Sequence, residues 1–200
     1  MAQKSGILRC IDNVITPEKV LFFDLDGTLV DTNHANFLSY IKAIQLENPA
    51  GSNLTYNPSQ RVSRSMLNDV IPNLTEFDYK RIIQCKEEFY KDFLKETKLN
   101  TVVVDVLFKY LSTNKAVLVT NCRKGRATLI LNYHELADKF THCFYREFDA
   151  NGKKVNKYLN AIRALNVSPD LVVIFENEQT EIDDAIEAGI KTNNIINVSI

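Results

Sequence analysis

Two aspartates, Asp24 and Asp26, directly follow the apolar run at residues 20–23 and precede Gly27 and Thr28. In an extended chain, residues two positions apart point to the same side, so both carboxylates can face one site. Two carboxylates held this close need a proton or a cation between them. Mg²⁺ takes oxygen ligands and is often held by one or two carboxylates together with a substrate phosphate. The spacing therefore indicates a magnesium and phosphate site rather than a solvated turn.

Two further apolar runs end in polar residues in the same way. The run at 115–119 ends in Thr120 and Asn121, and the run at 171–175 ends in Glu176 and Asn177. An unbroken apolar run is typical of a strand buried on both faces of a parallel sheet. Ligands bind at the carboxyl ends of such strands. We therefore expect the three polar ends to converge at one edge of the sheet.

Strand and helix patterns alternate along most of the chain. Further strands are expected at 142–145 and, as an edge strand, at 195–198, with helices at 102–111, 127–133, 152–165 and 182–189. This alternation predicts an α/β fold, with a Rossmann-like, doubly wound parallel sheet as its core.

A long helical pattern separates the first strand from the rest. Residues 34–98 carry apolar side chains at helical spacing, interrupted by a loop at 48–59, and Thr75 has the position of an N-cap for one long helix reaching Leu94. A crossover helix is far shorter than this segment. We therefore expect a small α-helical cap at 34–98, inserted into a core domain formed by residues 1–33 and 99–200.

Composition narrows the classes of partner. The 24 basic and 25 acidic residues give a net charge of −1, so the composition has no excess of positive charge that would indicate binding to nucleic acid or to a membrane surface. The four cysteines have no CxxC spacing, so reduced thiols are expected rather than a zinc site or a disulfide framework. No apolar run approaches 18 residues and no signal peptide is evident. We expect a cytoplasmic monomer or homodimer with a small-molecule substrate.

Residues 24–32, Asp-Leu-Asp-Gly-Thr-Leu-Val-Asp-Thr, resemble the first motif of the haloacid dehalogenase superfamily, and the resemblance extends from about residue 20 to the end. It is closest to the capped phosphatase type, similar to phosphoglycolate phosphatases and β-phosphoglucomutases. The resemblance implies that Asp24 is the nucleophile, Asp26 the acid/base and Thr120 a donor to the phosphate. Gly27, Thr28 and Asn121 would bind the phosphate. Mg²⁺ would be held by Asp24, by the backbone carbonyl of Asp26, and by the last motif.

The lysine expected by this resemblance is ambiguous, because the chain lacks the Lys-Pro pair common in capped relatives. Lys154 ranks first, since it lies 22 residues before Glu176 and, in the expected helix, one turn before Tyr158. Lys157 ranks second, after a plausible Asn156 cap, and Lys153 third.

The last motif also departs from the pattern, because Asn177 stands where relatives have an aspartate. Glu176 is then the best metal-binding acid, with Asn177 as a neutral ligand and Glu181 as the second choice among the acids. An amide oxygen can ligate Mg²⁺ but brings no negative charge.

These features together predict a Mg²⁺-dependent phosphohydrolase that acts on a small phosphomonoester through an aspartyl-phosphate. A phosphomutase or phosphotransferase would share every one of these residues and remains an alternative. A non-catalytic binding or regulatory protein on the same fold is a second alternative, because of Asn177. Dehalogenase chemistry is disfavoured, since it has no use for the acid at Asp26.

Overall fold

The computed structural model describes residues 11–47, 54–71 and 73–198. Cys10, the loop residues 48–53 and Pro72 lie outside this part of the chain. The chain divides into two compact units, one of residues 1–30 and 99–200 and the other of residues 31–98. Whether the second unit acts as a cap remains a proposal.

The first unit is built on a five-stranded sheet in the order β5-β4-β1-β6-β7, and every strand pairing is parallel. Its strands are β1 (Val20–Phe23), β4 (Lys115–Val119), β5 (His142–Phe144), β6 (Val172–Glu176) and β7 (Ile195–Asn197). The predicted α/β class and parallel sheet are therefore confirmed. β1 lies in the centre, where only an apolar strand can be buried on both faces.

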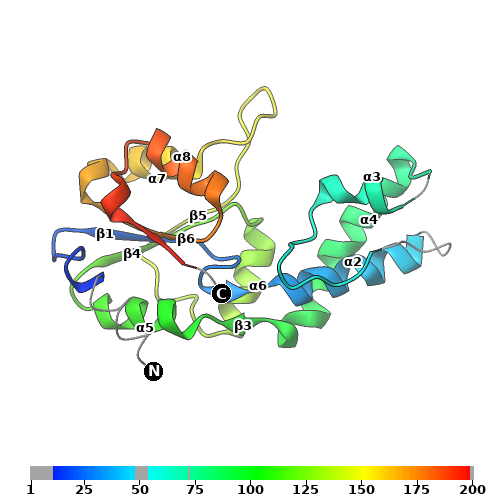
Figure 1. Cartoon of the computed structure of the whole chain (residues 1–200), viewed down its shortest axis with the longest axis horizontal. Coiled ribbons are helices and arrows are strands. Elements are labelled where there is room, and N and C mark those ends of the chain that lie inside the picture. The colour runs from blue at the N-terminus through cyan, green and yellow to red at the C-terminus, as the bar shows by residue number, and fades with distance from the viewer. Residues whose placement is uncertain (1–10, 48–53, 72, 199–200) are drawn as a thin grey trace. The chain divides into compact units, whose positions relative to one another are not determined.

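Helices cover both faces of this sheet (Figure 1). They are α5 (Thr101–Tyr110), α6 (Lys124–Tyr133), α7 (Lys157–Leu165) and α8 (Gln179–Glu187). Phe22, Val117 and Ile174 pack with α7 and α8 in one apolar cluster. Phe23 and Phe175 stack on the opposite face, with ring centroids 4.6 Å apart. Alternate residues of each strand thus face different helical layers. The same alternation determines the face of the sheet toward which the side chains at the strand ends point.

The helix expected at 152–165 begins five residues later, at Lys157. Asn156 causes this start, because its side-chain oxygen accepts hydrogen bonds from the backbone N–H groups of Tyr158 (3.0 Å) and Leu159 (3.1 Å). Residues 149–154 form a turn in which Gly152 has φ +77°. Lys154 is therefore not in a helix. The expected stop at Gly189 is confirmed, with φ +89°.

The second unit is helical in its described parts, with α2 (Asn33–Glu47), α3 (Leu67–Val70), α4 (Glu76–Phe89) and the 3₁₀ segments Arg64–Met66 and Tyr90–Glu96. Thr75 caps α4 as predicted, by accepting a hydrogen bond from the Asp78 N–H at 3.1 Å. The prediction of one helix reaching Leu94 is wrong, because the chain tightens into a 3₁₀ helix at Tyr90.

The chain passes between the two units through two short strands that the periodicity did not predict. β2 (Val30–Asp31) and β3 (Lys98–Leu99) pair in a separate two-stranded sheet. Lys98 was expected to end a helical segment and lies in a strand instead.

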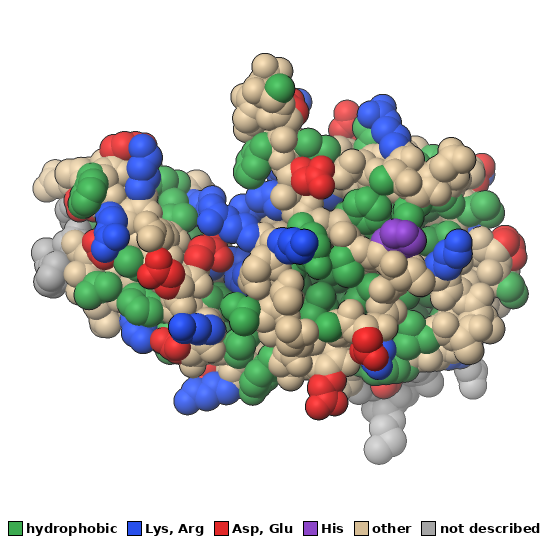
Figure 2. All heavy atoms as spheres, turned by 180° about the vertical axis from the view of Figure 1, so that it is seen from behind, with side chains coloured by type: hydrophobic (Ala, Val, Ile, Leu, Met, Phe, Trp, Pro, Cys, Tyr) green, Lys and Arg blue, Asp and Glu red, His purple; other side chains and the backbone are tan. Residues whose placement is uncertain are grey.

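Acidic and basic side chains intermingle over most of the face seen in Figure 2, as a net charge near zero would suggest. In the described part of the chain, no helix has the length and apolar character needed to cross a membrane.

Candidate active site

The three predicted strand ends meet at the carboxyl edge of the sheet. Phe23 is level with Leu118 of β4 and with Phe175 of β6, so Asp24, Thr120 and Glu176 follow within two residues of one another. The Asp24 backbone N–H continues the ladder by donating to the Phe175 carbonyl at 3.1 Å. All three side chains are buried, with exposed fractions of 5%, 1% and 0%. The structure thus brings the predicted constellation together.

A tight turn carries the chain off the end of β1. Gly27 has φ +85°, a conformation that side chains with a Cβ rarely adopt. Its backbone N–H donates to the Val30 carbonyl at 2.8 Å. A Cβ at this position would lie 2.5 Å from the Asn177 side-chain amide. Gly27 is thus required both by the turn and by the close approach of the last motif.

We expect Gly27→Ala to lower the free energy of unfolding by about 1–2 kcal/mol, the cost of left-handed backbone for a residue with a Cβ. At about 2–4 °C per kcal/mol for a chain of this size, the melting temperature should fall measurably. Gly125→Ala is the matched control: Gly125 lies in α6 with no atom within 4 Å of the added Cβ. That variant should be neutral or slightly stabilising. Equal melting temperatures for the two variants would contradict the argument.

Lys157 supplies the positive charge at the centre of the site. Its Nζ donates to Asp24 Oδ1 at 2.8 Å and to Glu176 Oε2 at 2.8 Å, and lies 3.4 Å from Glu181 Oε2. The side chain is only 2% exposed. Lys157 can reach Asp24 because it is the first residue of α7, which packs on the sheet face toward which Phe22 points.

The predicted ranking of the lysines is therefore reversed. Lys154, ranked first, is 43% exposed and forms ion pairs with Glu181 (2.9 Å) and Asp184 (3.6 Å) rather than with Asp24. The ranking relied on a helix that began at residue 152, whereas the chain is still in a turn there. Lys153, ranked third, lies in the same exposed turn.

Glu176, predicted as the metal-binding acid, has a full set of protein partners. Oε2 accepts hydrogen bonds from Lys157 Nζ (2.8 Å) and the Tyr158 hydroxyl (2.6 Å). Oε1 accepts from the backbone N–H groups of Asn177 (2.8 Å) and Glu178 (3.0 Å). Four donors occupy the lone pairs of this carboxylate.

Burial and neighbouring charges shift the pKa values of the two central groups, Asp24 and Lys157. Burial raises the pKa of Asp24 to about 8, and repulsion by Glu176 and Asp26 adds to this, while Lys157 opposes it. Burial would lower the pKa of Lys157, but attraction by Asp24, Tyr158 and Glu176 raises it well above the usual value. One buried ammonium thus lies between two buried carboxylates, those of Asp24 and Glu176.

Asn121 and Glu181 extend the site beside β4. Asn121 Nδ2 donates to Glu181 Oε2 at 2.6 Å, while Asn121 Oδ1 is buried and accepts no hydrogen bond from the described part of the chain. Burial would raise the pKa of Glu181, but Lys157 and Lys154 lower it, so Glu181 is ionised at neutral pH. Thr120 Oγ1 accepts from the Cys122 N–H at 3.1 Å, and its hydroxyl proton remains available for a ligand.

Asn177 points toward the turn after β1, and its amide also lies 3.3 Å from Glu176 Oε1. Its amide lies 3.0 Å from Thr28 Oγ1. With the amide nitrogen turned toward the turn, Asn177 also donates to the Asp26 carbonyl oxygen at 3.3 Å. This orientation satisfies the surrounding acceptors. Asn177 and Thr28 therefore hold the Gly27 turn against the end of β6.

Two residues of the site were not predicted in their observed roles. Arg126 lies on α6 with Nη2 3.5 Å from Asp26 Oδ2 and Nε donating to Cys122 Sγ at 3.1 Å. Sequence analysis placed Tyr158 only on the core-facing side of a helix. The sequence indicated only that Arg126 flanks the second motif, where it could attract an anionic substrate or be solvated, and not that it pairs with Asp26. The apolar periodicity around Tyr158 gave no signal for its hydrogen bond to Glu176.

The residues present fit a hard divalent cation. The Asp24 carboxylate and the Asp26 carbonyl offer oxygen, the donor type that Mg²⁺ prefers. The Asn177 amide would offer its oxygen to the ion by turning away its nitrogen, which donates to the Asp26 carbonyl in the metal-free protein. Burial disfavours the ionised form of Asp24 and raises its pKa, and added positive charge beside it would favour that form. Among the described residues, no group of three or more His, Cys, Asp or Glu side chains is arranged to hold a metal. A shell here would thus depend on a carbonyl and an amide.

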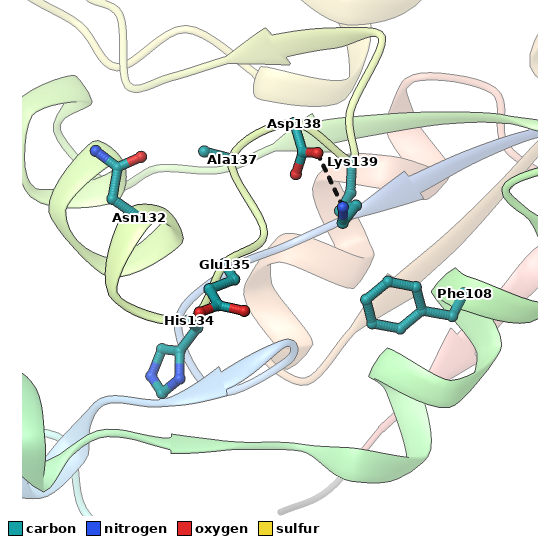
Figure 3. Close-up of a pocket in the computed structure, with 7 residues that line it drawn as sticks. All are labelled: Phe108, Asn132, His134, Glu135, Ala137, Asp138 and Lys139. Carbon is teal, nitrogen blue, oxygen red and sulfur yellow. Dashed lines mark hydrogen bonds and ion pairs between the residues drawn. The ribbon is translucent and has the colours of Figure 1, made fainter.

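A separate hollow lies at the other edge of the sheet (Figure 3). It is lined by Phe108 of α5, Asn132 of α6 and the loop from His134 to Lys139. Both helices reach this hollow with their carboxyl-terminal ends, away from the strand ends that carry Asp24 and Thr120. Lys139 pairs with its neighbour Asp138 on this loop at 2.9 Å. It therefore contributes nothing to the candidate site.

Comparison with known families decides the class. Residues 21–195 match the family model of haloacid dehalogenase-like hydrolases. The chain belongs to this family. The predicted family, and the prediction of a hydrolytic enzyme, are therefore confirmed.

Individual relatives agree with this membership. The chain is 27% identical over 184 residues to a phosphorylated carbohydrates phosphatase of Thermotoga maritima, a match that covers 86% of this chain and 82% of the relative. A haloacid dehalogenase-like hydrolase from Streptococcus pneumoniae has the same fold, with a TM-score of 0.66, 18% identity, and 88% and 84% of the two chains covered. CbbY from Rhodobacter sphaeroides, solved in complex with phosphate, gives a TM-score of 0.68 at 16% identity, with 86% and 84% covered.

Proposed function

We propose that this hydrolase is a Mg²⁺-dependent phosphatase that acts on a small phosphorylated carbohydrate through an aspartyl-phosphate on Asp24. The observation that carries the proposal is the buried contact of Lys157 with Asp24 at 2.8 Å, beside Thr120 at the end of the neighbouring strand. A nucleophile, a cation and a hydroxyl donor together meet the needs of phosphoryl transfer. The carbohydrate substrate class is carried over from the Thermotoga maritima relative.

In the first step, a carboxylate oxygen of Asp24 forms a bond to phosphorus while the bond between phosphorus and the leaving oxygen breaks. Asp26 gives its proton to that oxygen. Lys157 and Thr120 stabilise the negative charge that spreads over the other phosphoryl oxygens. In the second step, Asp26 takes a proton from water, water oxygen bonds to phosphorus, and inorganic phosphate leaves Asp24.

Asp24, the Asp26 carbonyl and Asn177 would hold Mg²⁺. When bound, this ion supplies positive charge to the transferring phosphoryl group and to the nucleophile. Asp24 has to be ionised to attack, and a bound cation would favour the ionised form against the burial that raises its pKa.

Substituting Asn177→Asp should tighten Mg²⁺ binding by about tenfold, because a carboxylate replaces a neutral amide in an already anionic shell. In the metal-free protein the same change puts a carboxylate against the Asp26 carbonyl, which Asn177 contacts at 3.3 Å in its hydrogen-bonded orientation. The melting temperature should thus rise more on adding Mg²⁺ than it does for the wild type. An unchanged Mg²⁺ response would remove Asn177 from the metal shell.

We further propose that the helical unit at 31–98 is a cap domain that selects the substrate. A phosphomutase would use the same residues, so the two reactions differ only in the fate of the aspartyl-phosphate. A cytoplasmic location stays a prediction.

The test is the release of inorganic phosphate from p-nitrophenyl phosphate and from a panel of sugar phosphates, with and without Mg²⁺. The proposal expects Mg²⁺-dependent release, with a preference for at least one sugar phosphate. Isomerised sugar phosphate without phosphate release would favour a mutase. No turnover by the pure, folded protein would favour a binding or regulatory role.

A further inference from the structure

The Glu176 carboxylate is surrounded by hydrogen-bond donors of the protein, whereas a metal ligand needs an oxygen that is open to the ion. It is the last residue of β6 and is fully buried, and strand parity places its side chain on the same face as Val172 and Ile174. That face packs against α7, whereas the next residue, Asn177, points to the turn after β1. The position of Glu176 in the strand thus directs its side chain toward Lys157.

Tyr158 completes this arrangement from the same helix. Lys157 Nζ and the Tyr158 hydroxyl both donate to Glu176 Oε2, at 2.8 Å and 2.6 Å. The Lys157 ammonium also lies 5.0 Å from the centre of the Tyr158 ring. The other carboxylate oxygen is fixed by two backbone N–H groups. The carboxylate has no freedom to rotate toward a cation without breaking several buried hydrogen bonds.

We propose that Glu176 and Tyr158 are positioning residues for Lys157, and that Glu176 is not a metal ligand in this chain. The Lys157 ammonium donates to Glu176 on one side and to Asp24 on the other, so Glu176 holds it beside Asp24. Tyr158 fixes the carboxylate that anchors it. Burial and the neighbouring Glu176 raise the pKa of Tyr158, which keeps the hydroxyl protonated and able to donate.

This arrangement removes Glu176 from the carboxylates that could bind the metal, so that cation binding and phosphate binding can be changed separately. The inference rests on the proposed function, in which phosphate binds beside Asp24, Lys157 and Thr120. Its test uses binding to the substrate-free protein as well as turnover, so its failure can be told apart from a failure of the phosphatase proposal.

The experiment measures Mn²⁺ affinity by calorimetry, inorganic phosphate affinity with Mn²⁺ saturating, and turnover of p-nitrophenyl phosphate. Tyr158→Phe keeps the buried ring and removes only the hydroxyl. We expect about a tenfold loss of phosphate affinity and of kcat, the usual effect of removing an outer-shell partner, with Mn²⁺ affinity within about twofold of wild type. Glu176→Gln should behave in the same way.

Tyr110→Phe is the matched control, because the Tyr110 hydroxyl also donates to a carboxylate at 2.6 Å, that of Asp12, at an exposed position on α5. It should leave all three quantities unchanged. A Mn²⁺ affinity that falls tenfold or more in Glu176→Gln would overturn the inference, because Glu176 would then ligate the metal. Equal phosphate affinity and kcat in Tyr158→Phe and Tyr110→Phe would overturn it independently.

Discussion

Substituting Asp24→Asn should reduce phosphate release from p-nitrophenyl phosphate by a factor on the order of 10³ or more, the scale seen when a nucleophile is removed. The amide retains the shape of the side chain but cannot form the bond to phosphorus. Asp24 is buried and bonded to Lys157, so no neighbouring carboxylate can replace it without moving.

Asp170→Asn is the control for this loss. Asp170 also pairs with a lysine, Lys191 at 3.0 Å, but both side chains are well exposed. A surface pair of this kind contributes little, so activity should be unchanged. Substantial Mg²⁺-dependent activity in Asp24→Asn would remove the aspartyl-phosphate from the mechanism.

The Asp24→Asn variant should not be less stable than wild type. The folded-state pKa of Asp24, about 8, lies above its usual value of 3.8. Folding therefore favours the protonated carboxyl, and this contribution to stability is lost as the pH rises from about 4 through 8. Asn cannot ionise, so the melting temperature of Asp24→Asn relative to wild type should increase over this range, measured without metal.

The second large effect concerns the two lysines. We expect Lys157→Met to lower kcat/KM by about 10²–10³, as for the loss of a donor that stabilises charge in the transition state. Lys154→Met should change it by less than about fivefold, because Lys154 forms half-exposed ion pairs. The pair of variants is matched in chemistry and differs in position by three residues.

Lys157→Met also leaves two buried carboxylates without their ammonium, which is destabilising. Activities should therefore be compared below the melting temperature of each variant, determined separately. A larger loss in Lys154→Met than in Lys157→Met would contradict the observed geometry and restore the ranking expected from sequence.

Much of this protein could be predicted from its sequence. The apolar runs before Asp24, Thr120 and Glu176 determine buried parallel strands, and parallel strands necessarily bring their carboxyl ends to one edge. The family, the sheet and the convergence of these residues follow from such local patterns.

Tertiary structure alone decided which side chains touch within that edge. The Asn156 cap is a local signal that the sequence already offered, but only the structure shows that α7 begins there and that Lys157 rather than Lys154 contacts Asp24. Strand parity turned Glu176 toward Lys157 and Tyr158, and Asn177 toward Thr28. These outcomes depend on where a helix begins and which face it covers, which are set by packing between segments distant in the chain rather than by residue spacing.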